Sequence, residues 1–314
     1  MTELRVREFS WRDMDRIFQI TMVTFPRDLE MIGFRKKTFE KKFRPSHVSK
    51  WVQKITRKEY EKVYVGETDE EVVAVATIRR CGPAWHLSGV MVDFEHRGKG
   101  YGRKIVTSTC ESACSFGAER IILRVPEDNF PAKNLYKSLG FEKFGKVIQY
   151  VRDCEQVKEQ TLPERYTLIR INIFNSRALQ ITDMCRSLKS ARIYGKSELM
   201  PWHNRVLQRI FQTEIKESYA VTSGGTWIGG YTFRTDHKKK GAGYVSIDIL
   251  PEHRGQGLEE ALLTRNLTRA FNLGLPQLIA WANQEHTELT KVCEEMGFSQ
   301  REVLEEMFKA CQKE

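Results

Sequence analysis

Residues 90–102 read VMVDFEHRGKGYG, an apolar stretch followed by an arginine and three alternating glycines. The apolar residues predict a strand, and the residues after Gly102 predict a helix that ends at Gly117. Because glycine lacks a Cβ atom, a ligand can approach such a turn closely and meet its N–H groups. The start of the helix adds a partial positive charge. The segment therefore predicts a site for a phosphate or pyrophosphate between a strand and a helix.

Two other kinds of phosphate-binding loop do not fit this stretch. A P-loop requires Gly-Lys followed by Ser or Thr, but Lys99 is followed by Gly100. A dinucleotide-binding turn requires another glycine three residues after Gly100, where Arg103 stands. A tight turn with no ligand is the remaining alternative. The basic residues Arg97, Lys99 and Arg103 favour anion binding over that alternative.

The segment recurs later in the chain. Residues 247–259 read IDILPEHRGQGLE, so that Arg254 follows Arg97 at a distance of 157 residues. Gly297-Phe298 repeats Gly140-Phe141 at the same offset, which is half of the 314 residues. Two landmarks at one offset predict a duplicated domain. We place the domains at residues 1–152 and 165–314, joined by a polar linker at residues 153–164.

Both halves show the same predicted order of elements. Strands are expected at residues 4–8, 60–65, 72–78, 86–92, 120–125, 141–151, 244–250 and 278–281. Helices are expected from residue 10, up to Gly117, and at residues 129–139, 258–273 and 285–296, with a basic helical region reaching about residue 58. A hairpin turn is expected at residues 223–226. The predicted fold class is α/β, with two tandem domains that each hold a mixed, mostly antiparallel sheet flanked by helices.

The composition argues against several classes of protein. Hydrophobic residues make up 40% and charged residues 29%, which is typical of a folded chain. No apolar stretch approaches the ~18 residues that span a bilayer, and the N-terminus lacks an apolar signal segment, so we expect a cytoplasmic protein that does not bind membranes. The seven cysteines are scattered and contain no Cys-x-x-Cys, which argues against a disulfide scaffold. The histidines form no metal-binding spacing, so no metal is expected.

The net charge of +10 is concentrated in one region. Between Arg35 and Lys58, ten basic residues face one acidic residue, Glu40. Such a surface attracts phosphates, acidic substrates or nucleic acid. A solvated helix face is the alternative explanation for these lysines and arginines.

The glycine segment resembles the GNAT superfamily of acyl-CoA-dependent N-acyltransferases. The family signature Arg/Gln-x-x-Gly-x-Gly/Ala is met by Arg97, Gly100 and Gly102. A second family pattern, Asn-x-x-Ala-x-x-Leu-Tyr-x-x-x-Gly-Phe, is matched in full. Its matching residues are Asn129, Ala132, Leu135, Tyr136, Gly140 and Phe141. The tandem arrangement is similar to that of mycothiol synthase, a relation of architecture that implies nothing about the acceptor.

The resemblance implies acetyl-CoA as co-substrate, bound by the first half. The backbone of Val90 and Val92 would pair with the pantetheine arm, and Asn129 would contact the same region. The pyrophosphate would lie on the N–H groups of the glycine loop, close to its basic side chains. The loop residues concerned are Arg97, Gly98, Lys99, Gly100, Tyr101 and Gly102, followed by Arg103.

Two residues are candidates for proton transfer. The resemblance implies that Tyr136 protonates the departing thiolate, whereas an aromatic residue packed under the sheet is the alternative. The two-residue alternation of a strand places His86 on one face with Ser88, Val90 and Val92. Some relatives carry a general base there, and histidine titrates in the useful range. A partly buried structural histidine is an equally open reading.

The second copy departs from the family pattern. Glu259 occupies the last small position of its loop, where a carboxylate would compete with a phosphate for the same N–H groups. His286 and Cys293 replace the asparagine and the tyrosine, and Gly243 corresponds to His86. The first domain is therefore predicted to be catalytic.

The sequence thus predicts an acetyl-CoA-dependent N-acetyltransferase. The acceptor would be a primary amine of a small molecule or protein, which attacks the thioester directly in a ternary complex. The alternative is a non-catalytic acyl-CoA-binding module whose basic helices dock a nucleic acid or a protein. Nucleic acid is not favoured, because the basic segment lacks a regular aromatic pattern. The duplication predicts a monomer in which the halves pair about a pseudo-twofold axis.

Overall fold

The computed structural model describes residues 3–25, 40, 61–69, 71–171, 183, 185–196, 214–236 and 241–311. Apart from Glu40, the basic region predicted between Arg35 and Lys58 lies outside these described residues. None of the helices described in these ranges is long and apolar enough to cross a membrane.

The elements of the first half follow the predicted order. Its strands are β1 (Arg5–Glu8), β2 (Glu61–Thr68), β3 (Glu71–Arg80), β4 (Ala84–Val92), β5 (Arg120–Pro126) and β6 (Glu142–Asp153). Its helices are α1 (Met14–Thr24), α4 (Tyr101–Ser115) and α5 (Phe130–Ser138). Helix α4 begins directly after the glycine loop and is followed by Gly117, which has the left-handed conformation typical of a helix end.

The second half repeats this order. Its strands are β7 (Tyr166–Arg170), β8 (Glu214–Ser223), β9 (Thr226–Asp236), β10 (Gly243–Ile249), β11 (Gln277–Asn283) and β12 (Ser299–Ala310). Its helices are α7 (Leu188–Tyr194), α9 (Leu258–Asn272) and α10 (Thr287–Glu295). Strands β8 and β9 meet at the predicted hairpin turn, where Ser223 pairs with Thr226.

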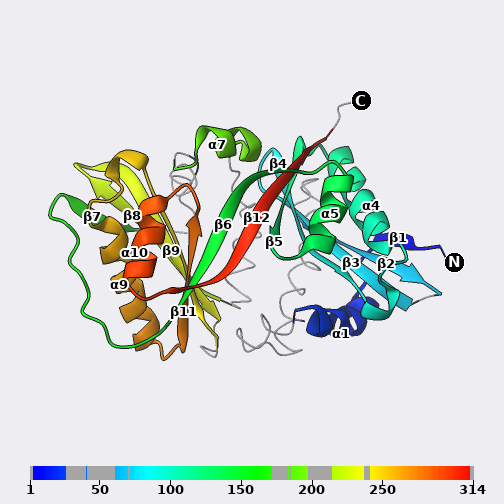
Figure 1. Ribbon diagram of the computed structural model, residues 1–314, viewed down its shortest axis with the longest axis horizontal. Coiled ribbons are helices and arrows are strands. Elements are labelled where there is room, and N and C mark those ends of the chain that lie inside the picture. Colours follow the sequence, from blue (N-terminus) through cyan, green and yellow to red (C-terminus); the bar gives the residue numbers. More distant parts are fainter. Residues whose placement is uncertain are drawn as a thin grey trace.

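All twelve strands form one sheet, in the order β1-β2-β3-β4-β5-β12-β6-β11-β10-β9-β8-β7. The pairs β4–β5 and β10–β11 are parallel, and the other neighbours are antiparallel. Figure 1 shows β6 and β12, the last strands of the two halves, running side by side through the middle of the molecule. The mixed, mostly antiparallel fold predicted from the sequence is confirmed.

The two halves exchange their last strands. Strand β12 pairs with β5 of the first half, from Leu304 opposite Pro126 to Ala310 opposite Arg120. Strand β6 pairs in turn with β11 of the second half. Each half therefore completes the sheet of the other, and the halves pair about a pseudo-twofold axis between β6 and β12. The predicted boundaries divide the chain by sequence, whereas the sheet crosses them.

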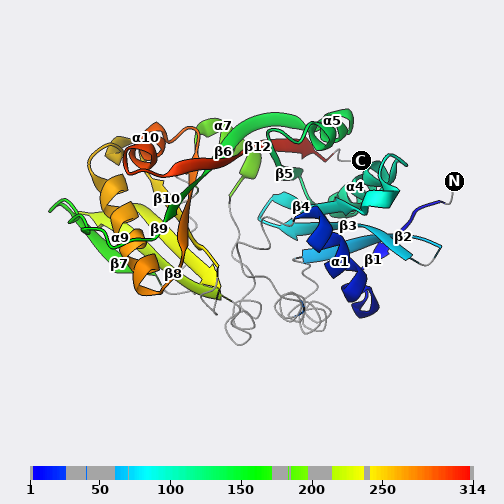
Figure 2. The ribbon, with the colours of Figure 1, turned by 60° about the horizontal axis from the view of Figure 1, so that its bottom comes forward.

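The first-half sheet has two differently covered faces. Helix α4 packs against the face that carries Ile78 and Leu87. Helix α1 packs against the opposite face, which carries Val75 and Met91. Helix α7 belongs to the second half but covers this same face, where Ile193 packs near β5. We call the two surfaces the α4 face and the α1/α7 face (Figure 2).

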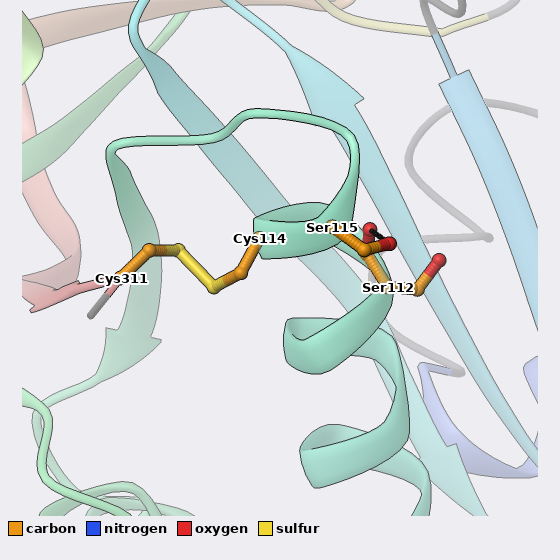
Figure 3. Close-up of a disulfide and its surroundings, with 4 residues drawn as sticks. All are labelled: Ser112, Cys114, Ser115 and Cys311. Carbon is orange, nitrogen blue, oxygen red and sulfur yellow. Dashed lines mark hydrogen bonds between the residues drawn. A yellow bond between two sulfur atoms is a disulfide. The ribbon is translucent and has the colours of Figure 1, made fainter. Parts of the chain in front are cut away.

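A disulfide ties the exchanged strand to the first half. Cys114 lies in the last turn of α4 and Cys311 directly follows β12, 197 residues further on (Figure 3). The backbone N–H of Cys311 also donates to the carbonyl of Glu119 at 2.9 Å. The sequence analysis, which argued against a disulfide scaffold, missed this pair. Cysteine spacing carries no sign of it, because only the strand exchange brings residue 311 beside α4.

Candidate functional site

The glycine loop of the first half leaves its backbone open. Gly98 and Gly100 have φ angles of 77° and 81°, so both adopt the left-handed conformation that favours glycine. A Cβ atom at either position would meet no atom within 4 Å. The first N–H groups of α4 follow directly and have no partner within the helix. The loop therefore offers free N–H groups and a helix N-terminus to an anion.

The basic side chains at the loop have two roles: one bonds to the backbone and holds the loop in place, and the others expose positive charge. The Nε atom of Arg97 donates to the carbonyl oxygen of Val92 at 3.2 Å, which fixes the loop to the end of β4. Lys99 and Arg103 are exposed, and Arg103 donates to the Ser138 hydroxyl on α5 at 2.7 Å. Arg97 therefore shapes the loop. Lys99 and Arg103 supply exposed positive charge, which is the sign that a pyrophosphate requires.

Tyr101 contributes only its backbone to this surface. Its side chain is buried against Leu4 and Val73, and its ring stacks on that of His96 with 6.4 Å between centroids. The neighbouring Gly102 faces α5, where a Cβ atom would come within 3.3 Å of the Leu135 side chain. Close packing of α4 on α5 thus explains the small residue at position 102.

Strands β4 and β5 separate beside the loop. They pair only from Ala84 opposite Arg120 to His86 opposite Ile122. Beyond this point the backbone of Val90 and Val92 faces no described strand on the β5 side, although β3 still pairs with Val92 on the other side. An unpaired strand edge can bind an extended ligand through backbone hydrogen bonds. The predicted place for the pantetheine arm is therefore geometrically open.

A β-bulge in β4 changes which side chains share a face. Val75 of β3 lies opposite Met91, whereas Thr77 lies opposite Ser88, so β4 contains one extra residue in between. Gly89 has a φ angle of 59° at this point. The expectation that His86 and Ser88 share a face with Val90 and Val92 is therefore wrong. His86 and Ser88 point to the α1/α7 face with Met91, because the bulge shifts the alternation by one residue.

His86 lies in an environment that opposes its protonation. Burial, together with the positive charges of Arg124 and Arg79, lowers the pKa of His86 from 6.5 to about 3. The imidazole is thus neutral throughout the physiological range. A histidine with this pKa can accept a hydrogen bond, but it accepts a proton poorly near pH 7.

Tyr136 is packed on the α4 face. Its side chain is 7% exposed, and its ring meets that of Phe141 edge-on with 5.7 Å between centroids. Burial, with a smaller effect from Cys110, raises the pKa of Tyr136 to about 12. The phenol therefore stays protonated, as a hydrogen-bond donor to a thiolate must be. Within the described part of the chain no group hydrogen-bonds to its hydroxyl.

Asn129 caps the helix that carries Tyr136. Its Oδ1 atom accepts a hydrogen bond from the N–H of Ala132 at 3.2 Å, and the side chain is exposed. This is the ordinary role of asparagine at the start of a helix. The capping bond uses the oxygen and leaves the amide NH2 group directed outward for a ligand.

The equivalent loop of the second half holds a carboxylate of its own. The Oε1 atom of Glu259 accepts the N–H of Gly255 at 3.2 Å and lies 3.1 Å from Nε2 of His286. Glu259 is 1% exposed. Burial raises the pKa of Glu259, but hydrogen bonds from His286 and from backbone N–H groups lower it. Together these hydrogen bonds outweigh burial, so the pKa lies below its ordinary value. The predicted competition for the loop N–H groups is thus visible in the structure.

Two more side chains of the second copy are engaged by other groups of the protein. Arg254 donates to the carbonyl oxygens of Ile249, Glu285 and Cys185 at 3.0, 3.2 and 3.3 Å. Cys293, at the position of Tyr136, is fully buried, and burial raises the pKa of its thiol to about 12. The second loop keeps the backbone shape of the first, but protein groups fill it.

Sequence reasoning missed a charged group where the two halves join. Arg124 interrupts the apolar strand RIILRVP, and Glu306 lies in the otherwise largely apolar VLEEMF of β12. Charged residues inside apolar strands are the available signal, since such residues are rarely buried unless paired. Among the described residues, no group of three His, Cys, Asp or Glu side chains is placed to hold a metal ion.

The family is decided by comparison with known proteins. A model of the Acetyltransferase (GNAT) family matches residues 15–141 and 182–298. The chain belongs to the GNAT acetyltransferase family. The two matched stretches are its tandem GNAT regions, and acetyl-CoA is the co-substrate that the family implies.

Two solved structures are similar in fold over nearly the whole chain. One is a tandem GNAT protein from the clavulanic acid biosynthesis pathway, solved without acetyl-CoA, with a TM-score of 0.65 and 12% identity over 99% of this chain and 100% of that one. Another is a GCN5-related N-acetyltransferase from Sphaerobacter thermophilus, with a TM-score of 0.69 and 14% identity over 99% and 96% of the two chains. At such identities the likeness concerns the fold. The particular similarity to mycothiol synthase stays an expectation.

A curated relative matches one part of this GNAT chain. YobR of Bacillus subtilis strain 168, described as an uncharacterized N-acetyltransferase, is 38% identical over 72 residues. The match covers 23% of this chain and 29% of the relative's length.

Proposed function

We propose that this GNAT protein transfers the acetyl group of acetyl-CoA to a primary amine, with one donor site per chain, in the first half. The observation that carries the proposal is the contrast between the two glycine loops. Among the described residues no acceptor bonds to the N–H groups of Gly98 and Gly100, whereas the N–H of Gly255 already donates to Glu259. A buried carboxylate at the phosphate position repels a second anion and removes its donors.

The donor is held by backbone in this proposal. Its pyrophosphate lies on the N–H groups after Arg97, whose own N–H already donates to the carbonyl oxygen of Phe94. Its pantetheine arm extends along the free edge of β4 from Val92 toward Val90. The bulge at Gly89 supports this placement, because it lies just beyond the last β4–β5 pair, where the arm has to enter. Asn129 lies at the start of α5 and offers its amide to the same arm.

The chemistry joins a neutral amine to the thioester carbonyl. The C–N bond forms, the C–S bond breaks, and the sulfur leaves as a thiolate. Tyr136 donates a hydrogen bond to that sulfur, a role supported by its position on α5 and by its protonated phenol. The amine also loses a proton. We assign that proton to solvent rather than to His86, whose lowered pKa makes it a weak base.

Calorimetric titration with acetyl-CoA tests the proposal. Gly100→Glu places a carboxylate in the first loop and should abolish binding, while the wild type should bind one molecule per chain. Gly257→Glu is the matched control, since Gly257 has nearly the same φ angle, 82° against 81°, in the second loop. It should bind acetyl-CoA like the wild type. Two sites in the wild type, or a loss of binding in the control alone, would overturn the assignment.

A further inference from the structure

The acceptor has to approach from the face that the donor leaves free. In the proposed function the donor enters the gap between β4 and β5 from the side of α4 and α5. The amine therefore reaches the thioester from the α1/α7 face. On that face the gap is bordered by His86 and Ser88 of β4 and by Arg124 of β5, two residues beyond the last β4–β5 pair.

Arg124 is held by two residues of the second half. Its Nε atom donates to Oε1 of Glu306 at 2.9 Å, and its NH2 group lies 2.8 Å from the same oxygen. The hydroxyl of Tyr194 on α7 also donates to this Oε1, at 2.6 Å. The guanidinium is thereby fixed in one orientation by a strand and a helix that lie far from it in sequence.

The arrangement leaves polar atoms without partners. In the described part of the molecule, the Oε2 atom of Glu306 and the Nε1 atom of Trp281 are buried and form no hydrogen bond. No described group accepts a hydrogen bond from the NH1 group of Arg124, whose side chain is 38% exposed. Unsatisfied buried groups cost stability. The Oε2 atom of Glu306 faces Gly145 of β6, whereas the NH1 group of Arg124 belongs to a side chain that is partly exposed.

The duplication does not repeat this arrangement. Trp281 occupies in the second half the position that Arg124 has in the first, and the guanidinium lies 5.8 Å from the centroid of the indole ring. Gln149 corresponds in the same way to Glu306. The arginine is therefore specific to the half whose donor loop is open.

The charges around His86 are two arginines and their acidic neighbours. Arg124 is bonded to Glu306, and Arg79 lies opposite Glu61. The two arginines still disfavour protonation of His86, which pairs with Arg79 across β3 and β4. Such a field attracts an anionic group and also favours the neutral form of an incoming amine. A fixed guanidinium with a free N–H group is well suited to a carboxylate or phosphate oxygen.

We infer that Arg124 anchors an oxyanion, a carboxylate or a phosphate, that the amine acceptor carries, and that Glu306 and Tyr194 position its guanidinium. The inference rests on the proposed function. It names the class of acceptor, an amine with an anionic group. It also assigns a function to the second half. That half supplies both positioning residues of an acceptor site that lies beside the first-half donor site.

Matched pairs of amines test the inference on the full chain. β-Alanine is compared with β-alaninamide, and phosphoethanolamine with ethanolamine, at saturating acetyl-CoA. The anionic member of a pair should have the lower KM by roughly 10- to 100-fold, the usual effect of one charged hydrogen bond. The pair that shows the preference distinguishes a carboxylate from a phosphate. If none is acetylated, the same four compounds are titrated into the CoA-loaded protein, and the anionic members should bind more tightly.

Variants assign the preference to one side chain. Arg124→Gln combined with Glu306→Gln removes both charges of the ion pair together, and should raise KM for the anionic amine with little change in kcat. Arg124→Lys should restore part of the preference. Arg120→Gln is the matched control on the same strand and face, and should behave like the wild type.

Two results would overturn the inference. One is equal KM values, and equal affinities, within each pair for the wild type. The other is a variant that raises KM for anionic and neutral amines alike, which would indicate a structural role. Failure of the proposed function gives a different result in the calorimetry, either no binding of acetyl-CoA to the wild type or two sites per chain.

Discussion

At the scale of single residues, the phenol of Tyr136 allows the sharpest test of the chemistry. Tyr136→Phe removes the hydroxyl but keeps the ring that packs against Phe141. If the hydroxyl assists the departing thiolate, kcat should fall roughly 10²-fold or more, the usual contribution of a general acid. The Kd for acetyl-CoA should stay within about threefold of the wild-type value. Steady-state rates and calorimetry on the same preparations check both numbers.

A packing role for Tyr136 would give a different result. Phe141→Leu serves as control, because it disturbs the same aromatic contact and leaves the hydroxyl in place. It should lower the free energy of unfolding by about 1 kcal/mol and leave kcat nearly unchanged at temperatures where the protein is folded. An equal loss of kcat in both variants would show that Tyr136 acts through packing.

The pKa of His86 predicts the effect of acid on stability. Since this pKa is lowered from 6.5 to about 3, the folded protein binds fewer protons than the unfolded chain between these values. The neutral histidine therefore costs nothing above pH 6.5, and stability is lost as the pH falls through this range. At pH 5 the loss should be about 1 kcal/mol, after allowance for partial exposure.

Urea unfolding of the wild type and His86→Gln at pH 7 and pH 5 measures this loss. The drop in unfolding free energy between the two pH values should be smaller in the variant. The pH profile of kcat should keep the same shape in both proteins between pH 5 and 8. An inflection near pH 6.5 that disappears in the variant would make His86 the general base after all.

Residue types at fixed spacing predicted the open shape of the first glycine loop, but not the surroundings of His86 and Arg124. The open loop at Gly98 and Gly100 follows from three alternating glycines, since few other residues adopt that backbone. The orientation of His86 did not follow, because the bulge at Gly89 is set by pairing with β3 and not by any local pattern. Arg124 escaped notice for a similar reason, as its partners come from β12 and α7.

At the scale of elements, the start of α9 carries two carboxylates, Glu259 and Glu260, where the start of α4 has Gly102 and Arg103. Glu259→Gly together with His286→Asn restores the small residue and the asparagine of the first copy. The cleared loop should then bind acetyl-CoA, and calorimetry should show a second, weaker site. The variant should also lose about 1–3 kcal/mol of unfolding free energy, because the buried hydrogen bonds at Glu259 are removed.

One more variant separates the loss of unfolding free energy from the gain of a second acetyl-CoA site. Glu259→Gln keeps the shape of the side chain and part of the hydrogen bonding but removes the charge. It should leave the second loop filled and acetyl-CoA binding at one site per chain. A second site in this variant would mean that charge alone keeps the donor out. Absence of a second site in the double variant would mean that Arg254, which is bonded to three carbonyl groups, also closes the loop.

At the scale of the whole molecule, the strand exchange explains why the repeat alone was an incomplete guide. The 157-residue offset predicts two similar units, and both were found. It does not reveal that β12 completes the first sheet, because β6 and β12 have equivalent places and either could pair with β5. Which of the two strands pairs with β5 depends on the direction that the chain takes after Phe141 and after Phe298. The acceptor side and the disulfide both follow from that choice.

The disulfide between Cys114 and Cys311 gives a last prediction, on the stability of the exchanged arrangement. It closes a loop of 197 residues and joins α4, which carries the donor loop, to β12, which carries Glu306. Cross-links over long loops stabilise mainly by restricting the unfolded chain, by about 2–4 kcal/mol. Without reductant, Cys114→Ser should lower the unfolding free energy by that amount. With dithiothreitol the variant and the wild type should agree.

Cysteine alkylation in denaturant supports this measurement by counting the free thiols. The oxidised wild type should expose five thiols, the free cysteines at positions 81, 110, 154, 185 and 293, and the reduced protein all seven. Cys81→Ser is the control, because this cysteine is free, and it should respond to dithiothreitol like the wild type. Acetyl-CoA binding should survive reduction, since the loop at Gly98 and Gly100 forms at the opposite end of α4. A loss of binding on reduction would instead make the disulfide part of the donor site.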